Sequence, residues 1–268
     1  MVMNPVRLLY FSPTGTTRKV VEAIAGGLGA DKPKHINLTS LGTRTGRGRK
    51  IQGGLTIIGV PVYTGRVALE VVKGLQRFKA EDAPAVIVVV YGNREYEDAL
   101  LELQHIATEA GFKPIAGAVF IGEHSFSTDS TPIAQGRPDA DDLDRARSFG
   151  TMVQKKINTI ESLRNVPPLA VPGNFPYRER GPARNTSPET SDALCIRCGK
   201  CVEVCPVATI TLKEDGVTTD KEKCTLCCAC VKNYPTEARR LEDPLLTQFI
   251  REKLSVMCNN RKEPEFYL

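Results

Sequence analysis

The cysteines of this 268-residue chain follow a spacing that occurs twice and restricts what the surrounding residues can fold around. The first copy runs Cys195-x2-Cys198-x2-Cys201-x3-Cys205-Pro206. The second copy begins 29 residues later and runs Cys224-x2-Cys227-x2-Cys230-x3-Tyr234-Pro235. A C-x2-C-x2-C-x3-C-P run is the thiolate pattern of cubane iron–sulfur clusters, in which three close thiolates hold one cluster and the fourth crosses to the other. Proline ends such a ligand loop because it fixes its own φ and donates no hydrogen bond.

Two other uses of these cysteines fit the pattern less well. A disulfide framework needs an oxidising compartment, and the first residues, Met1 to Pro5, lack the charged and apolar regions of an export signal. A zinc ribbon could take Cys195 and Cys198 with Cys224 and Cys227. That arrangement would leave the other regularly spaced cysteines without a role, so the sequence favours iron–sulfur ligation.

The two predicted clusters have unequal ligand sets. One [4Fe-4S] cluster has four thiolates, from Cys205, Cys224, Cys227 and Cys230. The other cluster, [4Fe-4S] or [3Fe-4S], has three, from Cys195, Cys198 and Cys201, because Tyr234 occupies the place of the crossing cysteine. Four possibilities remain for its fourth ligand position: a three-iron cluster that lacks this iron, a four-iron cluster with solvent on one iron, ligation by the Tyr234 phenolate, or ligation by a folded-back Cys258. A tolerated change at a labile site is a further interpretation of Tyr234.

Composition narrows the class of protein. The length predicts two domains, and no run of about 18 apolar residues predicts a membrane span. The net charge of +5 is spread along the chain without a basic stripe, so nucleic-acid binding is not expected. Nine cysteines without an export signal predict a reduced, cytoplasmic protein, and oxygen-sensitive clusters suggest an anaerobe.

The part of the chain before the cysteines alternates between strand and helix patterns. Strands are expected at 6–11, 35–38, 55–60, 85–91 and 115–121, and helices at 17–28, 67–78, 97–110 and 139–160. Such alternation predicts an α/β fold with a five-stranded, parallel, doubly wound sheet. Segment 39–54 is expected to be an exposed connection, and a final helix is expected at 245–257.

Domain boundaries follow from these patterns and from proline. We expect a sheet domain at 1–165, a proline-rich linker at 166–193, an iron–sulfur domain at 194–241, and a C-terminal helix and tail at 242–268.

Three loops follow the carboxyl ends of expected strands, where ligands of parallel sheets bind. The first contains Ser12, Thr14, Gly15, Thr16 and Thr17 and opens a helix, which favours phosphate binding over simple helix capping. The second contains Pro61, Val62, Tyr63, Thr64 and Gly65. The third contains Gly92, Asn93, Arg94 and Tyr96.

These loops carry a specific resemblance. Residues 6–161 resemble flavodoxins: 12–17 match their FMN phosphate loop, and 61–66 and 92–96 match the two loops around the isoalloxazine ring. Together with the cysteines, nearly the whole chain resembles flavodoxin–ferredoxin fusion proteins of anaerobic bacteria and archaea. The resemblance implies a flavodoxin-like sheet, a small α+β two-cluster ferredoxin-like domain, FMN, two four-iron clusters and electron transfer. Tyr234 departs from the pattern.

Individual residues have alternative roles. Tyr63 would stack on the flavin or only pack. Arg94 would stabilise the reduced flavin or pair with Glu97 or Asp98. His124 would relay a proton or be a hydrogen-bonded loop residue.

The sequence predicts an electron carrier that relays electrons between FMN and the clusters, with ferredoxin or another iron–sulfur or flavin oxidoreductase as its partner. No catalytic residue is assigned. The alternatives are an FMN-dependent reductase of a quinone or NAD(P)H-linked substrate, and a redox sensor that uses the incomplete cluster.

Overall fold

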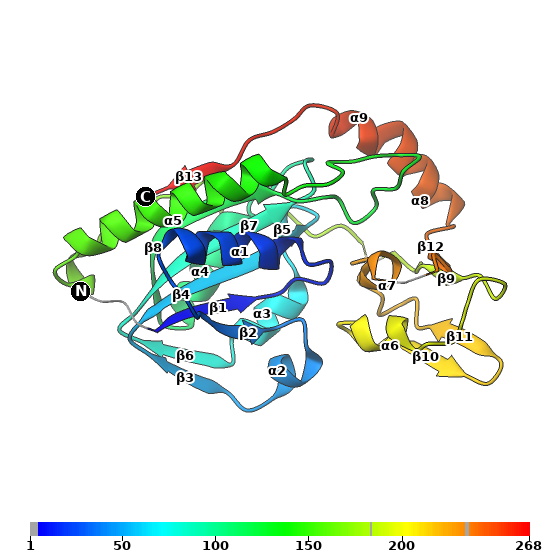
Figure 1. The fold of residues 1–268 in the computed structure, drawn as a ribbon, viewed down its shortest axis with the longest axis horizontal. Helices are drawn as coiled ribbons and strands as arrows, with labels where there is room; N and C mark the ends of the chain where they lie inside the picture. The colour runs from blue at the N-terminus through cyan, green and yellow to red at the C-terminus, as the bar shows by residue number, and fades with distance from the viewer. Residues whose placement is uncertain (1–4, 183, 234–235) are drawn as a thin grey trace.

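A central parallel sheet organises the larger part of the molecule, which is known from a computed structural model that describes residues 5–182, 184–233 and 236–268 (Figure 1). Its parallel strands are β1 (Val6–Tyr10), β2 (Lys34–Asn37), β4 (Leu55–Tyr63), β7 (Ala83–Tyr91) and β8 (Phe112–Ile121). They lie in the order β2-β1-β4-β7-β8. Numbered by these five strands, the order is 2-1-3-4-5, the flavodoxin-like arrangement with its switch point between β1 and β4. The expected fold class is confirmed.

The sequences of the central strands explain why these strands are buried. Every residue of β7, including the run Val86 to Val90, is buried. Valine and isoleucine pack well on a pleated surface, and strands with helices on both faces are apolar throughout. The buried central strands therefore position the loops at their carboxyl ends.

Helices cover both faces of the sheet. On one face lie α1 (Thr16–Gly27) and α5 (Ala140–Thr159), which bury Val20, Ile24, Phe149 and Val153 among others. On the other lie α3 (Leu69–Leu75) and α4 (Ala99–Glu109). Among the helices of the described residues, none has the length and apolar character needed to cross a lipid bilayer.

Several short elements were not expected from the sequence. The segment 39–54 contains α2 (Leu41–Thr45) and β3 (Arg49–Gln52), which pairs with β6 (Phe78–Glu81). The helix expected at 67–78 is shorter, because β5 (Arg66–Val67) and β6 take its two ends. At the far edge, β13 (Glu265–Tyr267) pairs antiparallel with β8.

The cysteine-rich part folds into a smaller unit beside the sheet (Figure 1). Its helices are α6 (Lys200–Val204) and α7 (Ala229–Lys232), and its strands pair antiparallel as β10 (Ile210–Lys213) with β11 (Gly216–Thr219), and β9 (Glu189–Thr190) with β12 (Arg239–Arg240). The chain then continues through α8 (Pro244–Phe249), a π-helix (Ile250–Leu254) and α9 (Ser255–Met257) back to the sheet.

Part of the expected linker lies against the sheet domain. After a 3₁₀ turn at Leu163–Asn165, the chain reaches α4, where Asp98 accepts hydrogen bonds from the backbone N–H of Asn174 (2.8 Å) and Arg178 (2.7 Å). The Tyr177 hydroxyl is hydrogen-bonded to His105 Nδ1 at 2.6 Å. These bonds hold residues 174–178 on α4, so this stretch is not a free tether.

Candidate functional site

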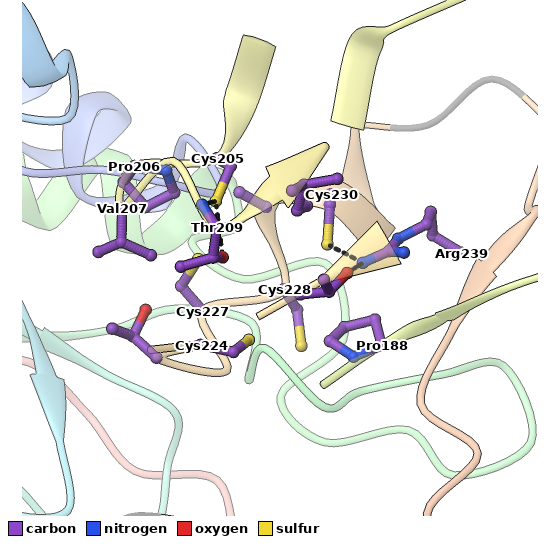
Figure 2. A pocket seen from close by; sticks show the side chains of 14 residues that line it. Pro188, Cys205, Pro206, Val207, Thr209, Cys224, Cys227, Cys228, Cys230 and Arg239 are labelled. Carbon is purple, nitrogen blue, oxygen red and sulfur yellow. Dashed lines mark hydrogen bonds between the residues drawn. The ribbon is translucent and has the colours of Figure 1, made fainter. Parts of the chain in front are cut away.

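Five cysteines line one pocket in the smaller unit (Figure 2). Four of them are the thiolates predicted for the second cluster, Cys205, Cys224, Cys227 and Cys230, and the fifth is Cys228. Cys205 comes from the end of α6, whereas Cys224, Cys227 and Cys228 lie on the loop that leads into α7, and Cys230 lies in α7 itself. The fold thus brings together cysteines from both sequence repeats.

The thiols of this pocket are the donor type that holds iron–sulfur clusters. Among residues 5–182, 184–233 and 236–268, no three His, Cys, Asp or Glu side chains converge as the ligands of one metal ion would. In a four-iron cluster each cysteine binds a different iron, so its sulfurs stand around the cluster instead of converging on one point. Thiols spread along the walls of a pocket match that requirement.

Buried thiols and a buried arginine set the electrostatics of the pocket. Burial raises the pKa of Cys227 to about 12, so a bound cation is needed to keep its thiolate at neutral pH. The Arg239 side chain is 2% exposed, donates to Thr190 Oγ1 (2.7 Å) and Thr219 Oγ1 (3.0 Å), and reaches Cys230 Sγ at 3.7 Å. Its charge lowers the pKa of Cys230 against the larger effect of burial.

The backbone conformation of the two cysteine loops repeats with the same 29-residue offset as their sequence. Three positions in each copy have left-handed φ values, and the members of each pair are 29 residues apart: Arg197 and Leu226 (54° and 53°), Gly199 and Cys228 (71° and 55°), and Ala208 and Glu237 (52° and 53°). Left-handed backbone is unfavourable for residues other than glycine and tends to persist at ligand-binding loops. Both copies therefore form the same kind of loop.

The first cysteine set is more open. Cys198 is exposed, Cys195 is partly buried, and Cys201 is buried beside Cys230 and Ile210. None of the three lines the pocket of Figure 2. The Tyr234 alternative lies outside the described residues. The structure places Cys258 in an apolar cluster with the π-helix, and not with this set.

The predicted phosphate loop lies at the start of α1. Gly15 is the N-cap residue, with φ of 87°, and has no side chain to cap the helix. Ser12 Oγ accepts a hydrogen bond from Arg18 N–H (3.0 Å), and the buried Thr17 hydroxyl has no hydrogen-bond partner among the described residues. An uncapped helix start with a spare hydroxyl suits an anion.

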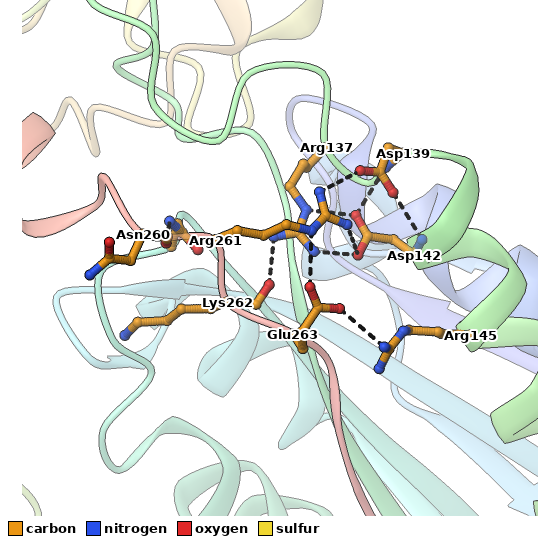
Figure 3. Close-up of polar contacts among 9 residues, drawn as sticks. Arg137, Asp139, Asp142, Arg145, Asn260, Arg261, Lys262 and Glu263 are labelled. Carbon is orange, nitrogen blue, oxygen red and sulfur yellow. Dashed lines mark hydrogen bonds and ion pairs between the residues drawn. The ribbon is translucent and has the colours of Figure 1, made fainter.

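A pocket adjoins this loop. Its lining combines loop threonines with charged side chains: Thr14, Thr16, Lys19, Glu123, Ser125, Gly136, Arg137 and Lys232. Arg137 is held by Asp142 (Nε to Oδ2, 2.7 Å) and by the Lys262 carbonyl (2.7 Å), as Figure 3 shows.

The two other predicted loops are shaped by left-handed residues. Thr64, Gly65 and Asn93 have φ of 53°, 79° and 64°. Asn93 is buried and its amide donates to the carbonyls of Cys258 and Asn260, both at 2.8 Å, whereas its Oδ1 has no partner among the described residues. Pro61 and Val62 end β4, and Gly92 packs against the His124 ring.

Some predicted side chains have structural partners. Arg94 forms an ion pair with Glu97 at 2.6 Å, the alternative weighed from the sequence. The Tyr96 hydroxyl donates to Glu265 (2.8 Å) and contacts the Tyr267 hydroxyl, so it anchors the C-terminal strand. His124 Nδ1 accepts from Phe126 N–H at 3.0 Å.

Tyr63 is partly buried and packs against the hydrophobic core of the sheet domain. Burial raises the pKa of Tyr63 well above its ordinary value, and the nearby Cys227, Glu70 and Cys228 raise it further. The contact that joins the two predicted sites lies at the phosphate loop, where Asn233 Nδ2, three residues beyond Cys230, donates to the Pro13 carbonyl at 3.4 Å. The fold thus places both kinds of predicted site side by side.

Sequence reasoning missed three charged residues of these sites: Lys232, Glu123 and Arg239. Glu123 and Lys232 lie close in sequence to residues of the predicted sites, but no sequence pattern indicates that they pair across the two units. Arg239 has no distinguishing motif around it.

Comparison with known proteins agrees with the cysteine motif. Residues 188–211 match the family described as 4Fe-4S binding domain. A 47-residue segment is 45% identical to one component of the ion-translocating oxidoreductase complex of Methanosarcina acetivorans, over 18% of this chain. The chain spans 18% of the length of that relative.

Solved structures similar to the sheet domain include flavodoxins. A flavodoxin from the domain Archaea is 14% identical, over 57% of this chain and 98% of its own, with a TM-score of 0.38. The flavodoxin of Streptococcus pneumoniae is 13% identical, over 56% and 98%, with a TM-score of 0.39. The Fusobacterium nucleatum flavodoxin bound to flavin mononucleotide is 15% identical, over 56% and 97%, with a TM-score of 0.36. The strand order, and not these scores, defines the fold.

The chain therefore joins a flavodoxin-like sheet to a segment of the 4Fe-4S binding type.

Proposed function

We propose that this protein is an electron-transfer flavoprotein that relays electrons between iron–sulfur clusters and FMN. The observation that carries the proposal is the contact between the predicted phosphate loop and the second cysteine loop, where Asn233 Nδ2, three residues beyond Cys230, donates to the Pro13 carbonyl at 3.4 Å. A flavin accepts one or two electrons, whereas each cluster accepts one. Placing them next to each other connects one-electron partners with two-electron chemistry.

The proposed ligand sets follow the sequence expectation. Cys205, Cys224, Cys227 and Cys230 would hold the second cluster, and Cys195, Cys198 and Cys201 the first. The phosphate of FMN would bind at the start of α1, and its ring between the loops after β4 and β7. The partners would be redox proteins that exchange single electrons with the more exposed cysteine set.

Anaerobic reconstitution with iron, sulfide and FMN provides the first test. We expect one FMN and ~7–8 iron per chain. Protein that binds zinc in preference to iron, or that takes up no flavin, would contradict the proposal.

The relay is tested by adding a low-potential one-electron donor and following the bleaching of the flavin. We expect Cys224→Ala, which removes a ligand of the second cluster, to slow bleaching severely. Cys228→Gly is the matched control, because Gly199 occupies the equivalent left-handed position in the first loop, and it should bleach like the unmodified protein. Equal bleaching in the Cys224→Ala variant would show that electrons bypass the second cluster.

A further inference from the structure

The pocket beside the phosphate loop is shared between the two units of the molecule. Thr14, Thr16 and Lys19 come from the flavodoxin-like sheet domain, whereas Lys232 comes from α7 of the cysteine-rich unit. Lys232 is two residues beyond Cys230, one of the proposed cluster ligands. The site expected to hold the flavin phosphate is thus closed by a residue that belongs to the other cofactor's unit.

Lys232 is held across the boundary by two polar contacts. Its Nζ lies 2.5 Å from Glu123 Oε1 and donates to the Ser127 carbonyl at 2.8 Å. The two side chains are 27% and 26% exposed, so each keeps about a quarter of its surface in contact with water. The neighbouring Asn233 Nδ2 also donates to the Pro13 carbonyl at 3.4 Å, which ties the end of α7 to the phosphate loop.

Glu123 poses an electrostatic problem for an anion in this pocket. Burial acts to raise its pKa, but the hydrogen bonds from Lys232 and from the Gly136 N–H outweigh burial and hold its pKa below the ordinary value. Glu123 is therefore a carboxylate at neutral pH. A carboxylate that lines a phosphate pocket repels the ligand unless a cation neutralises it.

Arg137 does not supply that neutralisation. Its guanidinium is bound to Asp142 through two nitrogens, and Asp142 is completely buried (Figure 3). Lys19 also lines the pocket, and its charge contributes to lowering the pKa of Glu123. Lys232 is the cation that pairs with Glu123 among the described residues.

We propose that the Lys232–Glu123 ion pair between the two units makes the pocket at the start of α1 able to accept the phosphate of FMN. This inference rests on the proposed flavin function and adds to it a specificity determinant from the iron–sulfur unit. FMN retention then depends on a side chain outside the flavodoxin-like sheet domain.

The test compares FMN with riboflavin, which has the same ring but no phosphate. Binding is measured by quenching of flavin fluorescence on anaerobically prepared protein that keeps its clusters and has been stripped of flavin. We expect Lys232→Met to weaken FMN binding at least tenfold and to leave riboflavin binding unchanged. Lys223→Met is the matched control, since Lys223 is an exposed lysine of the same unit that pairs with Asp220, and it should change neither affinity.

A double variant separates charge from shape. Lys232→Met combined with Glu123→Gln removes both charges, and we expect it to recover most of the lost FMN affinity. Inorganic phosphate should compete with FMN in the unmodified protein and less well in Lys232→Met.

The outcomes distinguish this inference from the proposed function. If Lys232→Met binds FMN like the unmodified protein, loses FMN and riboflavin equally, or is not rescued by Glu123→Gln, the ion pair does not govern the phosphate. If the unmodified protein binds neither flavin, the flavin function itself fails.

Discussion

His124 shows how one residue at the junction of the two units is set by its surroundings. Burial, together with the charges of Arg94 and Lys232, lowers its pKa to about 4. Its ring packs against Gly92, where an added Cβ would collide with it. The imidazole is therefore neutral at physiological pH and serves as a hydrogen-bond acceptor for Phe126 N–H.

A pH dependence of stability follows from this shift. In the unfolded chain a histidine binds its proton near pH 6.5, whereas folded His124 does so only near 4. Between these values the unfolded state binds more protons, so the folded state loses stability as the pH falls. Allowing for its partial exposure, we expect about 1 kcal/mol to be lost by pH 5.5.

His124→Gln keeps an acceptor for Phe126 and removes the titration. Between pH 7.5 and 5.5, the thermal midpoint of the unmodified protein should fall by about 2–4 °C more than that of the variant. Parallel curves for the two proteins would rule out His124 as the source.

Arg239 is a second single residue with a predicted effect, in this case on the reduction potential of the proposed second cluster. A buried positive charge that approaches Cys230 Sγ favours a cluster that has gained an electron, and hydrogen bonds to cluster sulfurs act in the same direction. We expect Arg239→Gln to lower the reduction potential of that cluster by roughly 60 mV, a tenfold change for one electron. The measurement is a redox titration followed by electron paramagnetic resonance.

Arg240→Gln is the control for this titration, because Arg240 is exposed and its side chain donates hydrogen bonds to Glu237. Its potential should match that of the unmodified protein. A similar potential for Arg239→Gln would mean that the buried charge is compensated by its surroundings.

At the scale of elements, the packing of α1 against α5 depends on two glycines. A Cβ on Gly150 would collide with the Ile24 carbonyl of α1 and lie 3.0 Å from the Gly27 Cα. Gly27, in turn, leaves no room for a Cβ beside the Arg147 carbonyl. The helices approach this closely because neither residue has a side chain, and α1 carries the phosphate loop at its other end.

Gly150→Ala should therefore destabilise the protein by about 1–3 kcal/mol, because the helices must separate to admit the methyl group. Gly26→Ala is the matched control: its Cβ would meet nothing within 4 Å, so the better helix propensity of alanine should stabilise the protein by up to about 1 kcal/mol. Thermal unfolding followed by circular dichroism measures both, and equal midpoints would contradict the close-packing argument.

At the scale of the whole molecule, the two units are joined by more than the connecting chain. Besides the Lys232 pair, Arg44 bonds to the Pro206 carbonyl, and an apolar cluster brings Leu226 together with Ile133 and Ile250. The C-terminal strand β13 then completes the sheet edge. Both sites are thus held in a constant relation to each other.

This arrangement predicts electron transfer within one chain. After rapid reduction of the clusters, the rate constant for flavin reduction should not change when the protein is diluted tenfold, because the effective concentration is set by the fold. Stopped-flow absorbance over a dilution series measures it. A rate that falls in proportion to concentration would indicate transfer between separate molecules.

Structural features with a sequence pattern inside a short window could be predicted, whereas features that depend on distant contacts could not. The strands and most helices were predicted because their apolar periodicity lies within short windows, and β7 is apolar along its whole length. Elements β3 and β13 are four and three residues long and pair with strands distant in sequence, so no window reveals them, and β5 has only two residues. The role of Tyr96 was decided by Glu265, which only folding brings near, whereas Arg94 pairs with Glu97 three residues away.

Ligand spacing and strand alternation were readable from the chain alone, because thiolate geometry and side-chain burial impose short, regular repeats on a sequence. The folded molecule decided which charges neutralise each other: Lys232 meets Glu123, which is 109 positions away, and Arg239 lies buried beside Cys230. Such pairings depend on the distance in space between segments, and the order of residues does not encode that distance locally. The tertiary structure therefore determines how the proposed cofactor sites are tuned.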